Sequence, residues 1–407
     1  MEFSPITNLN ETMTASLVGS VVETVGMTAA VADFPAPVGA VVRIERDANS
    51  TVEGEVVGFR DGLTLVYLLT VTAGLRRGNR VRLLRTTSSL RVGADLLGRI
   101  IDSRGHSIDG RPQPTLPDRV RRDRQAPLPI ERPRIDKPLA TGVQAIDALL
   151  TCGRGQRLGI FSGSGVGKSV LLGMMSRYTD ADVIVTGLIG ERGREVNEFI
   201  ERDLGAAGLA RSVVVVATSN EPALTRVHAA STATAIAEYF RDQGKQVLLL
   251  MDSVTRFAMA QREIGLAAGE PPTTRGYPPS TFALLPRLVE RAGRTRSGSI
   301  TAFYTVLVEG DDHNEPVADA VRGILDGHIV MERQIAERGR YPAINVLKSI
   351  SRTMPGCNSE EENILISKAK QYLSTYDDMA EMIRLGAYRR GSDPLVDEAI
   401  YFFPLLE

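Results

Sequence analysis

A glycine-rich stretch near the middle of the chain carries residue types that hold phosphate groups. It reads GIFSGSGVGKSVLLGMM, an apolar run followed by glycines and a helical pattern. It departs from the phosphate-loop pattern G-x-x-x-x-G-K-[ST] at the first position, which is serine. Glycines let backbone N–H groups approach a phosphate, the lysine neutralises it, and the next hydroxyl can ligate Mg²⁺. The residues predicted to contact a nucleotide are Ser162, Gly163, Ser164, Gly165, Val166, Gly167, Lys168, Ser169 and Val170.

Two acidic residues follow apolar runs further along the chain. QVLLLMD ends in Asp252, and TGLIGE ends in Glu191. Ligands of parallel sheets bind at the carboxyl ends of the strands, so we expect Asp252 to hold Mg²⁺ through water and Glu191 to orient an attacking water. The alternatives are a strand-ending aspartate that caps a turn and a helix-start glutamate that is stabilised by the helix dipole, as is expected of Glu195.

The composition limits the class of protein. The 407 residues are 43% hydrophobic and 24% charged with a net charge of −1, which indicates a globular protein of two or three domains. No apolar run reaches about 18 residues and no Lys or Arg precedes Arg43, so we expect neither a membrane span nor a secretory signal. We expect Cys152 and Cys357 to be reduced, buried thiols of a cytosolic protein. Metal-ligand spacing is absent among His106, His228, His313 and His328.

Patterns along the chain predict four parts. Short apolar runs between turn residues, such as VEGEVVGF and LTLVYLL, are typical of a small β-barrel. A stretch dense in Pro and Arg follows; its interleaved acids and missing aromatics favour a connector over a nucleic-acid arm. Strand-like runs then alternate with helical patterns, which predicts a parallel sheet with helices on both faces. We expect the barrel at 1–92, the connector at 93–140, a P-loop α/β domain at 141–356 and an α-helical domain at 357–407.

Three motifs together resemble the rotary-type ATPase family. They are SGSGVGKS, the GER at Gly190–Arg192, and YPAINVLKSISR, which fits P-[SA]-[LIV]-[DN]-x-x-x-S-x-S from Pro342 to Ser351. The family includes F-type and V-type catalytic subunits and type III secretion ATPases. The chain is most similar to the flagellar and virulence secretion branch, in stretches such as NEPVADAVRGILDGHIV and LGAYRRGSDPLVDEAI. The resemblance implies a RecA-like P-loop ATPase core between the barrel and the helical domain, and it suggests that the C-terminus is truncated.

The resemblance also implies roles for single residues, with ATP and Mg²⁺ as the ligands. Lys168 would meet the phosphates, and Ser169 and Asp252 would hold the metal. Glu191 matches the catalytic glutamate, and Arg192 beside it would lie at the γ-phosphate.

Three further residues match family positions that complete the site. Arg352 matches an arginine that a neighbouring subunit inserts; the alternative is a surface ion pair. Tyr341 matches the aromatic residue that stacks on adenine, and Tyr376 would close the other side of the base. For both tyrosines the alternative is an ordinary packing role.

Four functions could use a P-loop core of this kind. The first is a homohexameric ATPase that energises unfolding and export of proteins; the runner-up is the catalytic subunit of a proton-translocating F/V-type ATPase. A non-catalytic ring subunit is disfavoured because Glu191 is present. An RNA-translocating hexamer is disfavoured because residues 1–95 hold four aromatic residues and no basic residue before position 43.

The first function implies a set of partners and a location. These are chaperone–substrate complexes, a regulatory stator-like protein, a central stalk protein and a membrane export gate, with no nucleic acid. The protein would be cytoplasmic and peripheral at the inner-membrane export apparatus.

Overall fold

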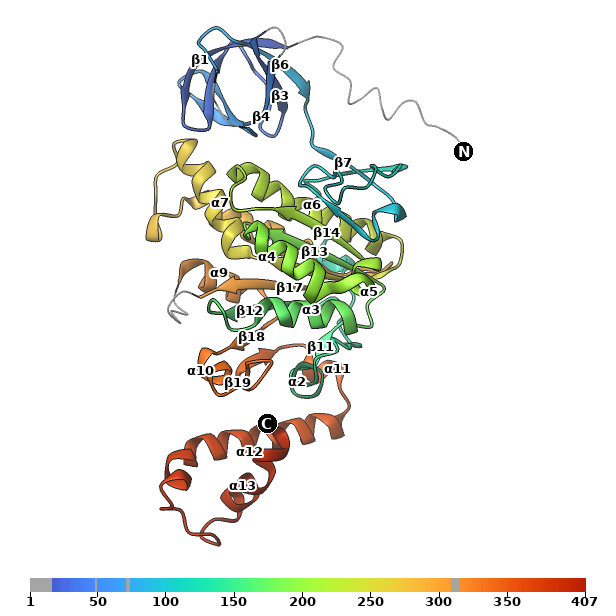
Figure 1. Cartoon of the computed structure of the whole chain (residues 1–407), viewed down its shortest axis with the longest axis vertical. Helices are drawn as coiled ribbons and strands as arrows, with labels where there is room; N and C mark the ends of the chain where they lie inside the picture. Colours follow the sequence, from blue (N-terminus) through green and yellow to red (C-terminus); the bar gives the residue numbers. More distant parts are fainter. Residues whose placement is uncertain (1–16, 48–49, 71–73, 309–314) are drawn as a thin grey trace.

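The computed structural model describes residues 17–47, 50–70, 74–308 and 315–407. A β-barrel, a sheet-and-helix core and a pair of helices follow one another along the long axis (Figure 1). Residues 1–16 of the expected barrel domain and His313 lie outside the described residues. Among the helices described, none is long and apolar enough to cross a membrane.

The barrel forms because its strands alternate inward apolar and outward polar residues. In the middle of β4, Val52, Gly54 and Val56 are buried while the residues between them are partly exposed. Gly54 is required there, since a Cβ would lie 2.6 Å from a Val66 methyl group and 2.9 Å from the Tyr67 carbonyl oxygen. The closed order is β1 (Val18–Val25), β2 (Thr28–Ala32), β5 (Leu63–Leu68), β4 (Ser50–Arg60), β3 (Val41–Asp47) and β6 (Arg80–Arg85).

The core is built on a mostly parallel sheet. All the strand-like runs that the sequence shows in this region lie in it, and the antiparallel β19 forms one edge. The order is β19 (Ile344–Ser351), β18 (Gly327–Met331), β12 (Arg157–Ser162), β17 (Ser299–Leu307), β15 (Gln246–Asp252), β13 (Val183–Ile189), β14 (Ser212–Ala217) and β8 (Arg99–Ile101). The RecA-like α/β prediction is confirmed.

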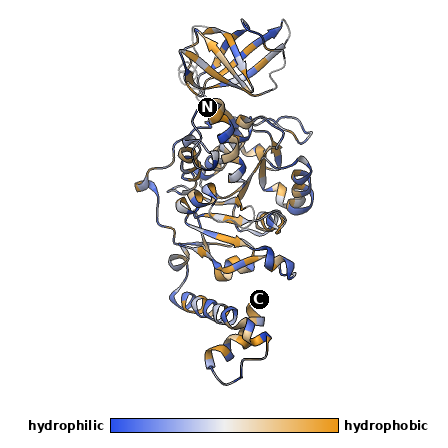
Figure 2. Cartoon of the chain, turned by 90° about the vertical axis from the view of Figure 1, so that its left-hand side faces the viewer, coloured by the Kyte–Doolittle hydropathy of each residue, from blue (hydrophilic) through white to orange (hydrophobic). Residues whose placement is uncertain are grey.

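Helices cover both faces of this sheet, as the sequence pattern predicts. In β13, Val183 and Val185 belong to the apolar cluster on one face, whereas Ile184 and Leu188 belong to the cluster on the other. Figure 2 shows the hydrophobic colour concentrated in the strands. One face packs on α6 (Ala223–Asp242), α7 (Val254–Ala267) and α8 (Pro279–Val289), and the other on α3 (Lys168–Tyr178), α4 (Gly193–Glu198) and α5 (Gly205–Ala210).

The segment expected to be a plain connector contributes a strand to the sheet. Residues 93–140 contain β8, which pairs in parallel with β14. The segment also contains β9 (Asp118–Arg121), which pairs with β7 (Ser89–Val92), outside the closed barrel. The pattern concealed β8 because it begins with a buried arginine, Arg99, whose charge interrupts the apolar run.

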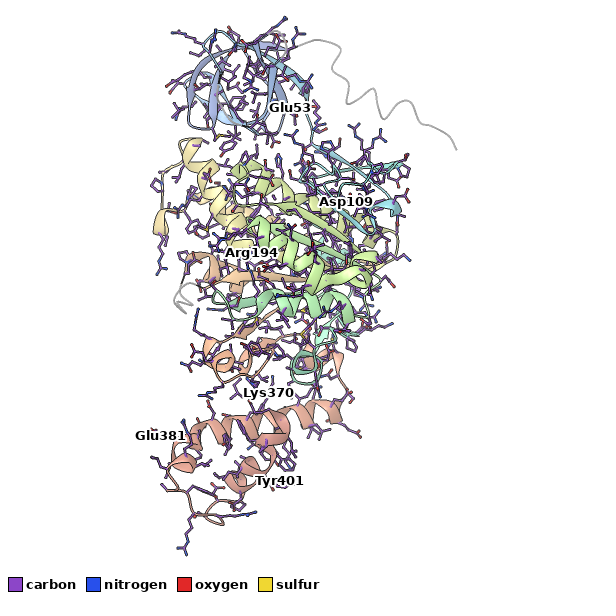
Figure 3. The ribbon with its side chains drawn as sticks, viewed as in Figure 1. Glu53, Asp109, Arg194, Lys370, Glu381 and Tyr401 are labelled. Atoms are coloured by element: carbon purple, nitrogen blue, oxygen red, sulfur yellow. The ribbon has the colours of Figure 1, made fainter. Side chains whose placement is uncertain are left out.

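An ion pair makes that buried arginine tolerable. Arg99 Nε donates to Asp109 Oδ2 at 2.7 Å and Arg99 Nη2 donates to Oδ1 at 3.0 Å (Asp109 is labelled in Figure 3). These bonds from Arg99 hold the pKa of Asp109 well below its usual range, although burial opposes them. Arg99 Nη2 also donates to the Pro112 carbonyl at 2.9 Å, so the arginine fastens residues 109–112 to the edge of the sheet.

The C-terminal part is a helix pair docked under the core. A capping box at Ser359 and Glu362 starts α12 (Glu360–Arg384), and α13 (Pro394–Leu406) packs against it. Leu373 and Phe403 reach the apolar cluster of the core. The predicted helical domain is confirmed. Both cysteines are free, Cys152 buried and Cys357 half-buried.

We expect Asp109→Ala to lower the free energy of unfolding by about 3–5 kcal/mol, because it leaves the buried guanidinium of Arg99 without its counter-charge. Urea unfolding followed by circular dichroism measures this. The control is Asp123→Ala, whose carboxylate is 62% exposed and meets Arg121 at 3.1 Å; an exposed pair contributes about 0–1 kcal/mol. Equal losses in the two variants would contradict the structural role of Asp109.

Candidate active site

The glycine-rich loop joins β12 to α3 at the carboxyl edge of the sheet. Ser162 is the last residue of β12, and α3 begins at Lys168. Gly167 caps the helix with φ 95°, a left-handed conformation that favours glycine. The backbone N–H groups at the start of α3 therefore face the edge where ligands of parallel sheets bind, and the helix dipole favours an anion there.

Three charged groups meet at this edge. The Lys168 ammonium lies 2.5 Å from Asp252 Oδ1 and 3.7 Å from Glu191 Oε1. All three side chains are largely buried, with 12%, 4% and 13% of their surface exposed for Lys168, Asp252 and Glu191. Burial disfavours the ammonium, but the two carboxylates outweigh it and raise the pKa of Lys168. The structure thus brings together residues that are 23 and 61 positions apart in the chain.

Asp252 is held in place from the neighbouring strand. The Thr305 hydroxyl donates to Asp252 Oδ1 at 2.7 Å. β15 and β17 are parallel, with Met251 beside Tyr304, so the next residue on each strand is opposite its partner. Thr305 is not among the site residues that the sequence predicts. The signal was the second threonine of the apolar run ITAFYTVLV, near the end of a strand that pairs with the one ending in Asp252.

Glu191 is positioned by the glycine before it. Gly190 has φ 74°, and a Cβ on it would lie 2.9 Å from the Arg256 Cβ. Burial, and then the negative charge of Asp252, raise the pKa of Glu191 to about 7, with Lys168 opposing. A carboxyl group with this pKa can accept a proton from water near neutral pH. Arg256, also missed from sequence, has a buried Nε with no hydrogen-bond partner among the described residues.

Hard oxygen ligands suited to Mg²⁺ are available in this cluster. The Asp252 carboxylate lies within it, and the exposed Ser169 follows Lys168 in the first turn of α3. Magnesium prefers one or two carboxylates together with phosphate oxygens and waters, so these donors fit the metal.

Two predicted catalytic arginines lie outside the cluster. Arg192 caps α4, with 81% of its side chain exposed and Glu195 at 3.5 Å. Arg352 directly follows β19, which pairs with β18. At the near end of β19, Ile344 pairs with Met331, which lies beside Ser162 of the loop; at the far end, Ser351 pairs with Gly327. Several residues of strand, at about 3.3 Å each, therefore separate Arg352 from its own loop. Both assignments remain predictions.

The two predicted adenine-contacting tyrosines differ in placement. Tyr341 lies beside the loop: a Cβ on Gly167 would be 3.7 Å from its ring, and 64% of Tyr341 is exposed. Tyr376 belongs to α12, and its ring stacks on Phe403 with centroids 3.6 Å apart. The ring contact that the structure gives Tyr376 is therefore within the helical domain rather than at the loop.

The loop, the two carboxylates and the parallel sheet define a P-loop nucleoside triphosphatase core. The model of the ATP synthase alpha/beta family nucleotide-binding domain matches residues 142–351, and that of the type III secretion EscN ATPase C-terminal domain matches residues 358–407. The chain belongs to the ATP synthase alpha/beta family.

Named relatives lie within one branch of this family. The chain is 51% identical over 390 residues to the flagellum-specific ATP synthase of Bacillus subtilis, covering 96% of this chain and 88% of that protein. It superposes on the assembled type III secretion ATPase EscN of enteropathogenic E. coli with a TM-score of 0.91 and 46% identity, covering 95% and 93% of the two chains. EscN in complex with its central stalk EscO gives 0.89 at 45% identity, with the same coverage.

We expect Ser162→Ala to change ATP turnover little. The Ser162 side chain is buried, and its Oγ has no hydrogen-bond partner among the described residues, so removing the hydroxyl breaks no bond that the structure shows. A hydroxyl bonded to the loop would be worth about 1 kcal/mol. Steady-state hydrolysis assays measure the effect, and a loss of more than about tenfold, the equivalent of 1.4 kcal/mol, would make Ser162 part of the mechanism.

Proposed function

We propose that this protein hydrolyses ATP with Mg²⁺ in a homohexameric ring, and that the ring energises unfolding and export of proteins through a flagellar or type III secretion apparatus. The observation that carries the proposal is the buried cluster of Lys168, Asp252 and Glu191 at the start of α3. The named relatives support the export branch. The match of residues 358–407 to a type III secretion domain disfavours the alternative, a proton-translocating F/V-type subunit.

Each group of the cluster has a role in this reaction. Lys168 and the N–H groups of the loop bind the β- and γ-phosphates, and Lys168 neutralises charge on the transferring group. Asp252, oriented by Thr305, and Ser169 hold Mg²⁺, which adds positive charge at the phosphates when bound. Glu191 orients the attacking water and accepts its proton. Tyr341 stacks on the base beside the loop.

Completion of the site requires a neighbouring subunit. Arg352 is separated from its own loop by most of β19, so within one chain it does not contact the phosphates that Lys168 binds. We infer that it serves the nucleotide of the adjacent protomer. A homohexamer supplies every interface with both partners, because one chain carries both Glu191 and Arg352.

We also propose the partners of an export ATPase. A central stalk protein is supported by the EscN–EscO complex. Chaperone–substrate complexes, a stator-like regulator and the membrane export gate follow from the proposed pathway, in which the ring is cytoplasmic and peripheral at the inner membrane. We propose no nucleic-acid partner.

We expect Glu191→Gln to retain Mg-ATP binding while hydrolysis slows by roughly 10²–10⁴-fold, because the amide keeps the shape but loses the proton acceptor. Fluorescent-nucleotide binding and single-turnover hydrolysis separate the two effects. Glu198→Gln is the matched control and should stay near wild type, because Glu198 lies at the end of the same helix and pairs with the exposed Arg194 at 2.8 Å. Full activity of Glu191→Gln would show that the water-activating role is misassigned.

We expect a mixture of Arg352→Ala and Lys168→Ala subunits to recover activity that neither variant has alone. A mixed interface can pair an intact loop with an intact arginine, and such an arginine is worth about 10³–10⁵ in rate in other phosphoryl-transfer enzymes. Specific activity of the wild type should also rise with protein concentration. Confirmed co-assembly without rescue, together with concentration-independent activity, would refute the shared site.

A further inference from the structure

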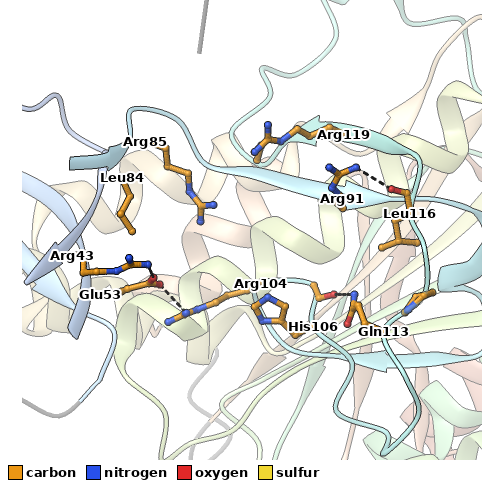
Figure 4. Close-up of a pocket in the computed structure, with 13 residues that line it drawn as sticks. Arg43, Glu53, Leu84, Arg85, Arg91, Arg104, His106, Gln113, Leu116 and Arg119 are labelled. Carbon is orange, nitrogen blue, oxygen red and sulfur yellow. Dashed lines mark hydrogen bonds and ion pairs between the residues drawn. The ribbon is translucent and has the colours of Figure 1, made fainter. Parts of the chain in front are cut away.

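A cavity of about 560 Å³ lies where the barrel meets the core (Figure 4), and none of its lining residues belongs to the glycine-rich loop. Its walls come from distant parts of the chain. The barrel contributes Arg43 of β3, Glu53 of β4 and the end of β6, including Arg85. The core contributes β7, β9 and the turn after β8. Any group bound in the cavity would therefore contact both parts at once.

Positive charge dominates the lining of this cavity. The lining residues include five arginines and one acidic residue, Glu53. Glu53 is shared: Arg43 Nη2 donates to its Oε1 at 3.3 Å and Arg104 Nη1 to its Oε2 at 3.0 Å. One carboxylate against five guanidiniums gives the lining residues themselves a net charge of +4, with histidine neutral. The arginines are Arg43, Arg85, Arg91, Arg104 and Arg119.

The turn that carries Arg104 is fixed by hydrogen bonds. Asp102 Oδ1 accepts from the backbone N–H groups of Arg104 and His106, both at 2.8 Å. Gln113 Nε2 donates to the Gly105 carbonyl at 2.9 Å. On β7, Arg91 Nη1 donates to the Leu116 carbonyl at 3.3 Å. This part of the cavity wall is therefore already ordered before any ligand binds.

The positive charge of the cavity lining affects a neighbouring buried arginine, Arg122. Arg122 is 7% exposed, and its Nη1 has no hydrogen-bond partner among the described residues. Burial lowers its pKa to about 10, with Glu55 opposing and the charges of Arg85 and Arg104 contributing to the lowering. An anion in the cavity would offset the repulsion among these guanidiniums.

We propose that this cavity binds a small anion with two or more phosphate groups, which holds the barrel on the core. A guanidinium group can donate two parallel hydrogen bonds to two oxygens of one phosphate. A phosphate group also carries more negative charge than a carboxylate of similar size. A volume of about 560 Å³ accommodates a ligand of nucleotide size. Leu84, Pro114 and Leu116 give the cavity an apolar side that an organic group can contact.

Calorimetric titration of the full chain with inorganic tripolyphosphate tests this proposal. Every protein carries Lys168→Ala to weaken phosphate binding at the loop, and sodium chloride keeps the ionic strength constant. Adding Arg85→Ala and Arg104→Ala should raise the Kd for tripolyphosphate at least tenfold. The loss of even one hydrogen bond to a charged group weakens affinity by about that factor. Adding Arg389→Ala and Arg390→Ala removes the same charge from exposed positions in the helical domain and should leave affinity unchanged.

Two further measurements keep the test decisive. The conservative pair Arg85→Lys and Arg104→Lys keeps the charge but loses the fork of donors, so its affinity should be intermediate; this pair carries the comparison if the alanine pair unfolds. Tripolyphosphate should raise the thermal unfolding midpoint of the parent and of the control variant. The increase should be smaller for the variant with Arg85→Ala and Arg104→Ala. Equal affinity in the pocket and control variants, or no binding to the parent, would overturn the proposal.

Discussion

The buried ammonium of Lys168 is the constraint on which the active site depends. A charge with only 12% of its side chain exposed requires compensation inside the protein, and Asp252 and Glu191 supply it. The same arrangement explains the raised pKa of Glu191, because two carboxylates share one cation in a desolvated space. Phosphates that meet Lys168 would compete with both carboxylates for the same ammonium, so a bound nucleotide calls for the further positive charge that Mg²⁺ would supply.

The order of strands satisfies that requirement. β15 and β13 are neighbours, while β17 separates β15 from β12. The parallel direction places the ends of all three functional strands at one edge, and β17 contributes the threonine that fixes Asp252. β19 runs antiparallel, which carries its far end, and Arg352 after it, to the opposite edge. The same topology thus brings Lys168, Asp252 and Glu191 together at one edge of the sheet and places Arg352 away from them.

Much of this could be predicted from the sequence, because the relevant signals are local. The strand that ends in Asp252 and the glycine pattern before Lys168 are contiguous in the chain, and both lie where expected. The register that sets Thr305 beside Asp252 is a property of strand pairing, which a pattern in one segment does not specify. Strand β8 was missed for a related reason: its buried arginine is neutralised by Asp109, and only the fold shows that pairing.

Pairing of this kind also occurs in the arginine-rich segment that the sequence pattern predicts to be a connector. Its interleaved acids and missing aromatics disfavour a nucleic-acid arm, and the structure shows how several of these acids are engaged. Asp109 bonds Arg99, Asp123 bonds Arg121, and Asp102 fixes the turn that presents Arg104. Asp109 and Asp123 are therefore paired with arginines that do not line the cavity, and the one carboxylate of its lining comes from the barrel. Net composition averages over such pairs, so a chain with a net charge of −1 can still concentrate positive charge where two of its domains meet.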